Sequence, residues 1–574
     1  MRHALLRLCA ALILISPFLL CIKAAQASIT TVINLHRPDQ GFNDPSTADP
    51  ASTAGGNNGA TLGAQRLIAF QFAANLWGSF LSSPIEIRID ANFDSLPCTD
   101  IAAVLGGARP NTVHRDFAGA PLANTWFPQA LANKFAGADL LPDISDINAT
   151  FNSAVGTTCP FPSVWYYGLD ANPPAGDLDF VRVVLHELAH GLGFISLVNL
   201  ATGAKALGLD DVFSRNLEDH STGKLYPDMT DAERITASQN TGNLHSVGAH
   251  VVAASGRLTG GVDPPGHVRM YAPNPQQSGS SVSHFDTTVI PAQLMEPFYT
   301  GPNHDIGLTS ELFRDIGWEI LPPMVVSAIL PSSRSVQVGV SATAFATIIN
   351  LGPGMAIGCG IAPITSIPAA FTYQITNPAT NAVIGSPNTA VDIAQGTAQS
   401  FVFAVTPTAP MAPTDVQFSF GCANSAPAPI NTGLNTLLLT ASATSVPDIV
   451  ALAATLNNNG IVNIPGTNGS GAFSVATVNL GSAGDIAASA DTGSATLPVN
   501  ISVCQTDPPS GQCISAIGSS VTTTIAPNAT PTFGIFVQAS GNVPFDPAIN
   551  RIFVRFKDAG VVTRGSTSVA VRTQ

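Results

Sequence analysis

The sequence predicts a multidomain protein in which one α/β (α+β) domain precedes two all-β sandwiches. The first observation is an apolar helical stretch, residues 177–192, set among segments that alternate between helix and strand patterns. The second is Pro322-Pro323, after which Val/Thr/Ala/Ile strands alternate with Gly, Pro and Asn turns and helical periodicity almost disappears. The third is an internal repeat in this second half, with a period of about 130 residues.

The first domain, residues 61–321, is predicted to begin and end with a helix. Residues 61–82 carry an apolar face of helical spacing, and residues 85–90 alternate strictly between apolar and polar side chains, as a half-buried strand does. Residues 28–60 are predicted to be a short strand at 29–35 followed by a linker rich in Asn, Gly, Ala, Thr and Pro. The remaining predicted elements are a helix at 126–135, strands near 144–151 and 164–169, the helix at 177–192, and a closing helix at 308–316.

The repeat in the second half predicts two similar modules, residues 322–446 and 447–574. The segment AFATIINLG at 344–352 recurs, with one inserted residue, at 472–481, and FVFAV at 401–405 recurs approximately at 533–537. Short alternating strands in this arrangement are typical of immunoglobulin-like sandwiches. Such a fold does not specify a function, so attachment to a surface or polymer and a role as spacers both stay open.

The N-terminus predicts export. Arg2 and Arg7 precede an apolar run at residues 8–20, and Ala25-Gln26-Ala27 supplies a small-x-small cleavage site. The run is too short for a membrane-spanning helix, so residues 1–27 are interpreted as a signal peptide and the mature protein as secreted, without membrane insertion.

Cysteine usage fits this interpretation. Removal of the signal peptide takes two of the eight cysteines with it, and an oxidising compartment permits disulfides between the other six. One pair per predicted domain is the simplest arrangement, with free buried thiols as the alternative. The predicted pairs are Cys98 with Cys159, Cys359 with Cys422, and Cys504 with Cys513.

The charge balance excludes some partners. Three of the 23 basic residues lie in the predicted signal peptide, so the mature chain carries 20 basic and 37 acidic residues, a formal charge of −17. Nucleic acids and anionic membranes require basic patches, and the sequence shows none.

The most informative motif is H-E-x-x-H, formed by His186, Glu187 and His190. Helical residues four apart lie on one face, so both imidazoles can bind one metal ion, and Glu187 can reach a water beside it. A glutamate base next to a two-histidine grip is typical of zinc hydrolases. A buried helix with two structural histidines is the alternative.

A catalytic zinc site normally needs a third protein ligand. In the short form of the motif that ligand would be residue 196, but Ser196 is a poor zinc ligand. The next candidate is His284 in the segment SVSHFD, eleven residues before Met295 in LMEP. Other candidates remain, and these are Glu218, His245, His250, His267 and His304.

In these motifs the chain resembles the metzincin metallopeptidases, in particular the leishmanolysin-like branch, over roughly residues 60–320. In that branch a long insertion, here residues 191–283, separates the third histidine from the first two. The resemblance implies that His186, His190 and His284 bind one Zn²⁺ and that Glu187 is the general base. It further implies that Met295 forms a Met-turn beneath the metal, that Gly193 lets the chain leave the helix, and that the substrates are proteins or peptides.

Several further points follow from the residues. The insertion is predicted to be mostly loops with one short helix, and Tyr299 is interpreted as a packing residue. Asp170, Asp177 and Asp179 could bind calcium, although helix-start carboxylates explain them more simply. No cysteine lies between residues 28 and 97, which argues against a cysteine-switch zymogen. Two other functions stay open: an extracellular adhesin or matrix-binding protein with a structural or inactive zinc site, and a hydrolase of non-peptide amides or esters.

Overall fold

The computed structural model describes residues 27–352 and 354–574. The predicted signal peptide, with Cys9 and Cys21, therefore lies outside the described residues apart from Ala27. Among the residues that the structure describes, no helix combines the length and apolar composition needed to cross a bilayer.

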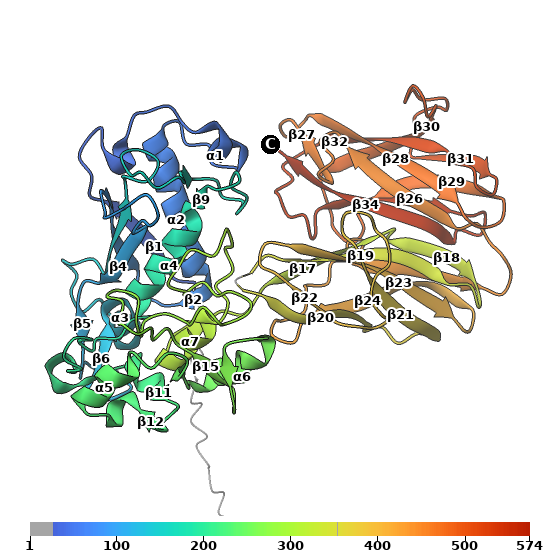
Figure 1. Ribbon diagram of the computed structural model, residues 1–574. Helices are drawn as coiled ribbons and strands as arrows, with labels where there is room; N and C mark the ends of the chain where they lie inside the picture. Colours follow the sequence, from blue (N-terminus) through green and yellow to red (C-terminus); the bar gives the residue numbers. More distant parts are fainter. Residues whose placement is uncertain (1–26, 353) are drawn as a thin grey trace, which may run out of the picture.

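The described residues form three hydrophobic cores, which confirms a multidomain architecture dominated by β-sheets (Figure 1). The first core extends from Phe42 to Trp318, the second from Val325 to Leu439, and the third from Ile449 to Val571. The two C-terminal cores belong to β-sandwiches, while the first lies between helices and a small mixed sheet.

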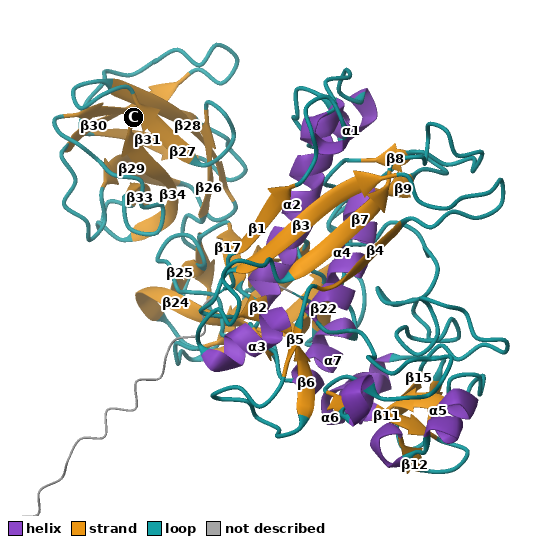
Figure 2. Cartoon of the chain, turned by 90° about the vertical axis from the view of Figure 1, so that its left-hand side faces the viewer, coloured by secondary structure: helices purple, strands orange, loops and turns teal. Residues whose placement is uncertain are grey.

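A four-stranded sheet with the order β1-β3-β7-β4 organises the first domain, and β4 is its only antiparallel member. Helices α2 and α4 pack against each other and against this sheet (Figure 2). The strands are β1 (Thr30–Asn34), β3 (Ile87–Asp94), β4 (Gly106–Pro110) and β7 (Ile147–Asn152), and the helices are α1 (Pro50–Ala54), α2 (Leu62–Phe80), α3 (Gln129–Ala136), α4 (Phe180–Leu192) and α7 (Thr309–Ile316).

Three small sheets complete this part of the domain. They consist of β5 (Val113–His114), β6 (Thr125–Pro128) and β10 (Asp210–Asp211); β8 (Trp165–Tyr166) and β9 (Leu178–Asp179); and β2 (Leu81–Ser82) with β16 (Glu319–Ile320).

The long elements of this domain lie where their sequence patterns predict them. Helix α2 begins after Thr61, whose hydroxyl accepts a hydrogen bond from the amide of Ala64 and so caps the helix. Strand β3 alternates between buried and half-buried side chains, as its period of two requires. The prediction was less accurate for residues 126–135, where β6 precedes α3 and shortens the helix.

The prediction that a linker follows the first strand is wrong. Strand β1 pairs in parallel with β3, and the residues after it are part of the first core. Phe42 is buried against Phe70 and Phe93, and the fully buried Asn57 donates to the carbonyl oxygens of Gln65 and Tyr167. The sequence did not predict this packing because only a few buried side chains anchor the segment, and most of its residues are polar or small.

The insertion between His190 and His284 is also more ordered than predicted. It contains a five-stranded antiparallel sheet with the order β12-β11-β13-β15-β14 and two helices rather than one. The strands are β11 (Leu217–Asp219), β12 (Lys224–Leu225), β13 (Leu244–Ser246), β14 (Val262–Asp263) and β15 (His267–Arg269), and the helices are α5 (Asp231–Ala237) and α6 (Ala249–Ala254). The strands have two or three residues each, too few to show a periodic pattern in the sequence.

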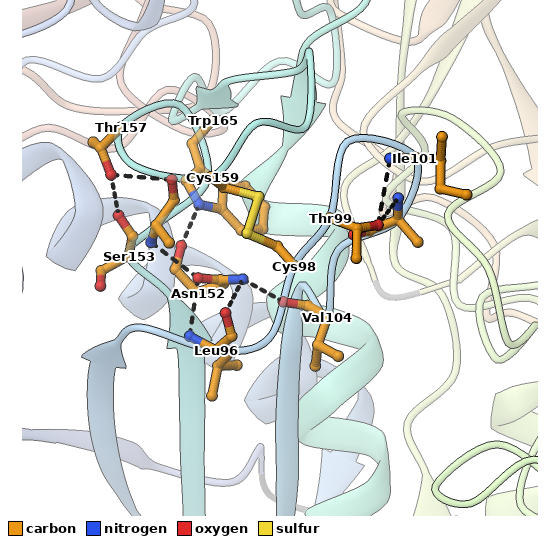
Figure 3. The surroundings of a disulfide bond; sticks show 12 residues. Leu96, Cys98, Thr99, Ile101, Val104, Asn152, Ser153, Thr157, Cys159 and Trp165 are labelled. Atoms are coloured by element: carbon orange, nitrogen blue, oxygen red, sulfur yellow. Dashed lines mark hydrogen bonds between the residues drawn. A yellow bond between two sulfur atoms is a disulfide. The ribbon is translucent and has the colours of Figure 1, made fainter.

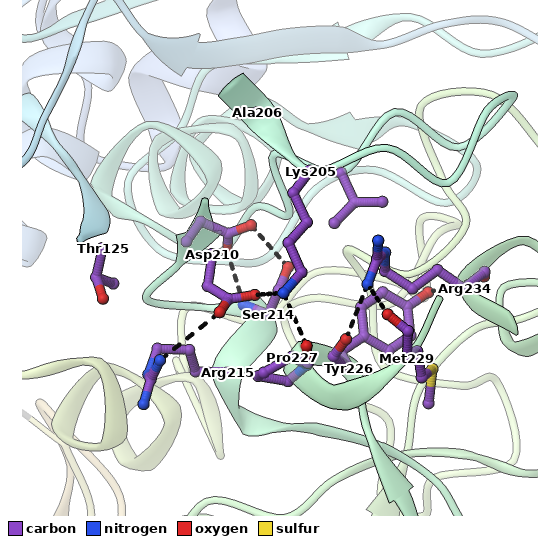
Figure 4. Close-up of polar contacts among 12 residues, drawn as sticks. Thr125, Lys205, Ala206, Asp210, Ser214, Arg215, Tyr226, Pro227, Met229 and Arg234 are labelled. Atoms are coloured by element: carbon purple, nitrogen blue, oxygen red, sulfur yellow. Dashed lines mark hydrogen bonds and ion pairs between the residues drawn. The ribbon is translucent and has the colours of Figure 1, made fainter. Parts of the chain in front are cut away.

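Polar contacts hold the remaining loops of the insertion together (Figure 4). Lys205 pairs with Asp210 at 2.7 Å and donates to the carbonyl oxygen of Pro227 at 2.8 Å. The buried guanidinium of Arg234 donates to the carbonyl oxygens of Tyr226 and Met229. These contacts add to the apolar side chains that the insertion contributes to the first core, among them Phe213, Tyr226 and Leu244.

The two C-terminal modules share one topology, which explains the sequence repeat. In each module a four-stranded sheet packs on a five-stranded one, and the strand orders correspond one to one: β17-β19-β23-β21 with β26-β28-β32-β30, and β18-β25-β24-β20-β22 with β27-β34-β33-β29-β31. The repeated segments lie in β19 and β28 and in β23 and β32, which are equivalent strands.

The first module comprises β17 (Val325–Leu330), β18 (Ser333–Gln337), β19 (Ala342–Asn350), β20 (Ala356–Pro363), β21 (Ala369–Thr376), β22 (Val391–Ile393), β23 (Ala398–Pro407), β24 (Met411–Gly421) and β25 (Thr436–Ser442). The second comprises β26 (Ile449–Thr455), β27 (Ile461–Ile464), β28 (Ser470–Asn479), β29 (Gly484–Asp491), β30 (Val499–Thr506), β31 (Ser520–Ile525), β32 (Thr532–Ala539), β33 (Arg551–Lys557) and β34 (Thr563–Thr573).

The repeated Asn-Leu-Gly has a structural cause. Asn350 and Asn479 end equivalent strands, and both are fully buried. Each amide group donates to two backbone carbonyl oxygens, and each amide oxygen accepts from the backbone of the following glycine, Gly352 or Gly481. The side chain thus satisfies buried backbone groups at a turn between the sheets.

All three predicted disulfides are present, one in each domain. Cys98–Cys159 joins the loop after β3 to the loop after β7 (Figure 3). Beside it Asn152 bonds to the backbone of Leu96 and Val104, and its own carbonyl oxygen accepts from the indole of Trp165. Three disulfides are typical of proteins that fold in an oxidising compartment.

Asn479→Ala should destabilise the second module by about 2 kcal/mol, because buried backbone groups lose their partners. Thermal or urea unfolding of the full chain, monitored for the transition of this module, measures the change. Asn468→Ala is the matched control: Asn468 is exposed in the same module, and its removal should change stability by less than about 0.5 kcal/mol. Equal effects would refute the role assigned to Asn479.

Candidate metal centre

Helix α4 positions the H-E-x-x-H motif inside the first domain. It begins after Asp179, whose carboxylate accepts from the amide of Arg182, and nearly all of its side chains are buried. The indole of Trp77 on α2 donates to the carbonyl oxygen of Leu185 at 3.0 Å, which fixes the helix axially. The helix ends at Gly193, where φ is 128° and a Cβ would come within 2.9 Å of Ile316.

His186, His190 and His284 converge at the C-terminal half of α4. The Nε2 atom of His284 lies 3.1 Å from Nε2 of His186 and 3.2 Å from Nε2 of His190. The three ligand atoms all fall within 4.8 Å of one another, so they can hold a single metal ion. The residue predicted from SVSHFD is thus the third member of the cluster.

Backbone carbonyl groups orient all three rings. The Nδ1 atoms of His186, His190 and His284 lie 2.8, 2.8 and 2.7 Å from the carbonyl oxygens of Leu294, Phe194 and Ser280. A carbonyl oxygen only accepts, so each Nδ1 carries the proton and each neutral ring presents an Nε2 lone pair to the other two. Hydrogen bonds from the ring nitrogen that does not face the ion are characteristic of histidine metal ligands.

This donor set fits a zinc ion. Burial, with the other imidazoles adding to it at His186 and His284, lowers the pKa of every ring, to about 3 for His186 and about 4 for His190. The rings are therefore neutral at physiological pH, as coordination requires. Zn–N distances of about 2.1 Å in a tetrahedron imply nitrogen atoms about 3.4 Å apart, close to the separations seen here.

Glu187 lies beside the cluster without joining it. Its side chain is buried, and its Cγ would lie 3.0 Å from a Cβ placed on Gly106 of β4. Burial raises the pKa of Glu187 to about 8, while a hydrogen bond to the backbone of Ala108 opposes that rise. A nearby cation would lower this pKa again, because it favours the carboxylate.

Leu294 and Met295 contact the ligand set through their backbone. The carbonyl oxygen of Met295 accepts from the amide of Phe285 at 2.8 Å, and the Met295 side chain is fully buried. Its neighbour Leu294 supplies the carbonyl that orients His186. One turn therefore contacts both the residue after His284 and the ring of His186.

Sequence reasoning missed Arg182, which ties this turn to α4. Its buried guanidinium donates to the carbonyl oxygens of Gln293 (2.9 Å) and Asn303 (3.3 Å) and to the hydroxyl of Thr300. A lone arginine in an apolar helix was a signal, since buried cations need several acceptors.

The other candidates lie elsewhere. His304 pairs with Asp179 at 2.8 Å, and the hydroxyl of Tyr299 accepts from the amide of Asp179 at 3.0 Å. Both residues thus sit at the start of α4, about 10 Å along the axis from His186, and Tyr299 packs as expected. Asp170 accepts from Tyr166, and among the described residues Asp170, Asp177 and Asp179 form no three-ligand cluster.

Comparisons with known proteins neither contradict this site nor identify the chain. A family model described as SPBPB7E8-like matches residues 89–241, less than half of the chain. No curated protein matches.

Many solved structures resemble parts of the chain weakly, and three serve as examples. The N-terminal domain of PorA is 10% identical, covering 22% of this chain and 97% of its own, with a TM-score of 0.15. The secreted serine protease VesC from Vibrio cholerae is 12% identical, covering 37% and 46%, with a TM-score of 0.13. BcpA, the major pilin subunit of Bacillus cereus, is 10% identical, covering 44% and 70%, with a TM-score of 0.16.

His284→Ala should weaken zinc binding by more than about 100-fold, since loss of a group that only hydrogen-bonds to a ligand already costs about 10- to 100-fold. Competition with a chromophoric chelator measures the affinity. His250→Ala is the matched control, because His250 is an exposed histidine of the same insertion, paired with Asp315. Unchanged affinity in His284→Ala would assign the third-ligand role to another residue.

Proposed function

We propose that this chain is a secreted zinc-dependent endopeptidase. The observation that carries the proposal is the buried carboxylate of Glu187 next to three neutral imidazoles that share one focus. A purely structural zinc site needs no base beside it and normally closes the fourth position with another Cys or His. The three disulfides support the secreted part of the proposal.

The proposed chemistry assigns a distinct task to each group. When bound, a zinc ion would acidify water and polarise a substrate carbonyl. His186, His190 and His284 would hold that ion through their neutral imidazole rings, because the carbonyl acceptors fix the tautomer of each ring. Glu187 accepts a proton from the attacking water and returns it to the departing amine, so the proton balance closes within one turnover.

Strand β4 supports a peptide as the substrate. It is the edge of the sheet β1-β3-β7-β4, and Ala108 on this strand contacts Glu187 through its backbone. An extended peptide can pair with an open edge through main-chain hydrogen bonds, which would place a backbone amide next to Glu187. A small non-peptide amide or ester would not use such an edge.

The catalytic domain is proposed to be metzincin-like, of the leishmanolysin-like branch. The displaced third histidine, the methionine turn and Gly193 support this assignment. The sandwiches are proposed to be immunoglobulin-like modules that act as spacers or attach the enzyme to a surface or polymer. An adhesin with an inactive site is the rival, and Glu187 argues against it for the reason given above.

Glu187→Ala should abolish cleavage of an unfolded protein such as casein, lowering kcat by at least about 100-fold, while zinc content stays the same. Both proteins are assayed as purified mature chains, with zinc determined in each. Cleavage by the wild type alone, at equal zinc, supports the peptidase. Zinc lost together with activity would make Glu187 a ligand or structural residue, and zinc absent from both would overturn the proposal.

Gly106→Ala should lower kcat by about 10- to 100-fold, because the added methyl group displaces Glu187, and small misplacements of this order are costly. The new Cβ would meet the Cγ of Glu187 and the ring of the buried Phe151 at 3.0 Å. Gly107→Ala is the matched control, since a Cβ there has no neighbour within 4 Å. Equal kcat in the two variants would contradict the contact between β4 and Glu187.

A further inference from the structure

A second cluster of metal-binding side chains lies in the insertion. Glu218, His220 and His267 each offer one ligand atom, and these atoms lie within 4.8 Å of one another. The Oε1 atom of Glu218 is 3.2 Å from Nδ1 of His220 and 3.3 Å from Nδ1 of His267. None of the three belongs to the centre on α4.

The insertion sheet creates this cluster through its register. In the order β11-β13-β15, Glu218 lies opposite His245, and His245 lies opposite Arg269. Residues two apart on a strand share a face. His220, two residues after Glu218, and His267, two residues before Arg269, therefore lie on the same face of the sheet as Glu218 and His245. Glu218 and His267 thus approach each other across the central strand.

Hydrogen bonding leaves His267 unsatisfied. Its Nδ1 atom is buried and has no hydrogen-bond partner in the described residues, although Glu218 is within ion-pair distance. A buried nitrogen without a partner is costly, and coordination to an ion would satisfy it.

The charge of Glu218 is equally uncompensated. Among the described residues, its only ion-pair partners are His220 and His267, which are charged only when protonated. The cations on the other strands of the sheet have partners of their own: Arg269 pairs with Asp263 at 2.6 and 2.9 Å, and Lys224 pairs with Glu233 at 2.7 Å. Asp263 also binds His245 at 2.8 Å. The side chains of Glu218 and His267 are only 15% and 17% exposed, so water screens this charge poorly.

We propose that Glu218, His220 and His267 form a second metal site, for a divalent transition-metal ion such as zinc, that fastens the insertion sheet. One carboxylate and two imidazoles suit such an ion, with water completing the coordination at the half-exposed His220. This site is structural and does not depend on the proposed peptidase activity.

The site is well placed to fix the third ligand of the first centre. Directly after β15, the amide of Tyr271 donates to the carbonyl oxygen of His284, and the amide of Val282 donates back to Tyr271, both at 2.8 Å. An ion that joins β11 to β15 would therefore steady the segment after β15, to which His284 is hydrogen-bonded.

Zinc stoichiometry of the full mature chain tests the proposal, measured by elemental analysis after dialysis against a zinc buffer. The wild type and the control His250→Ala should hold two ions per chain. His220→Ala/His267→Ala should hold one, and so should His186→Ala/His190→Ala. In the latter variant added zinc should raise Tm, because an ion that binds only the folded state stabilises it.

A single ion in the wild type that disappears from His186→Ala/His190→Ala would overturn the second site, whatever the proteolytic activity. If His220→Ala/His267→Ala fails to fold, Glu218→Gln preserves the side-chain shape and should still lose one ion. Two ions retained in Glu218→Gln and in a folded His220→Ala/His267→Ala would equally refute the assignment. Absence of peptidase activity with two bound ions would leave this proposal intact and refute only the proposed function.

Discussion

Three imidazole lone pairs that face one another across about 3 Å are the constraint on which the centre depends. The backbone carbonyls of Leu294, Phe194 and Ser280 occupy the opposite side of each ring, so no ring can turn its N–H toward its neighbours without losing a hydrogen bond. Protonation is no remedy either, because burial lowers the pKa of all three. A shared cation relieves this repulsion, and the surrounding fold holds the rings in place for it.

The sequence predicted the parts of the fold that local patterns encode. Helix α4 has an apolar run, a capping aspartate and a closing glycine, and equivalent sandwich strands repeat the same residues. The pairing of segments that lie far apart in the sequence could not be predicted in the same way. Strand β4 is glycine-rich, so nothing in its composition suggests an edge strand beside Glu187. Likewise, no periodic pattern links Glu218 to His267, because strand register rather than spacing brings them together.

The disulfides and buried asparagines show why the second half was easier to predict. In each sandwich a buried asparagine, Asn350 or Asn479, satisfies the turn that immediately follows its own strand, so part of the pattern is local in sequence. The modules also contact each other through specific polar groups: Arg334 pairs with Asp448 at 2.9 Å, and the hydroxyl of Ser333 donates to the carbonyl oxygen of Ser566. These contacts limit the relative motion of the two sandwiches.

A third ligand supplied from far along the chain requires a rigid support, since loop closure over so many residues costs entropy and leaves the ligand poorly placed. The structure supplies that support in two ways. Arg182 holds the turn around Met295 against α4. The amide of Tyr271, which follows strand β15 of the insertion sheet, donates a hydrogen bond to the carbonyl oxygen of His284. The sheet itself has strands of only two or three residues, and exposed charge pairs of the insertion such as Lys224 with Glu233 contribute little to its stability. A second ion at Glu218, His220 and His267 would add rigidity to β15, which is followed closely by Tyr271, the hydrogen-bond partner of His284.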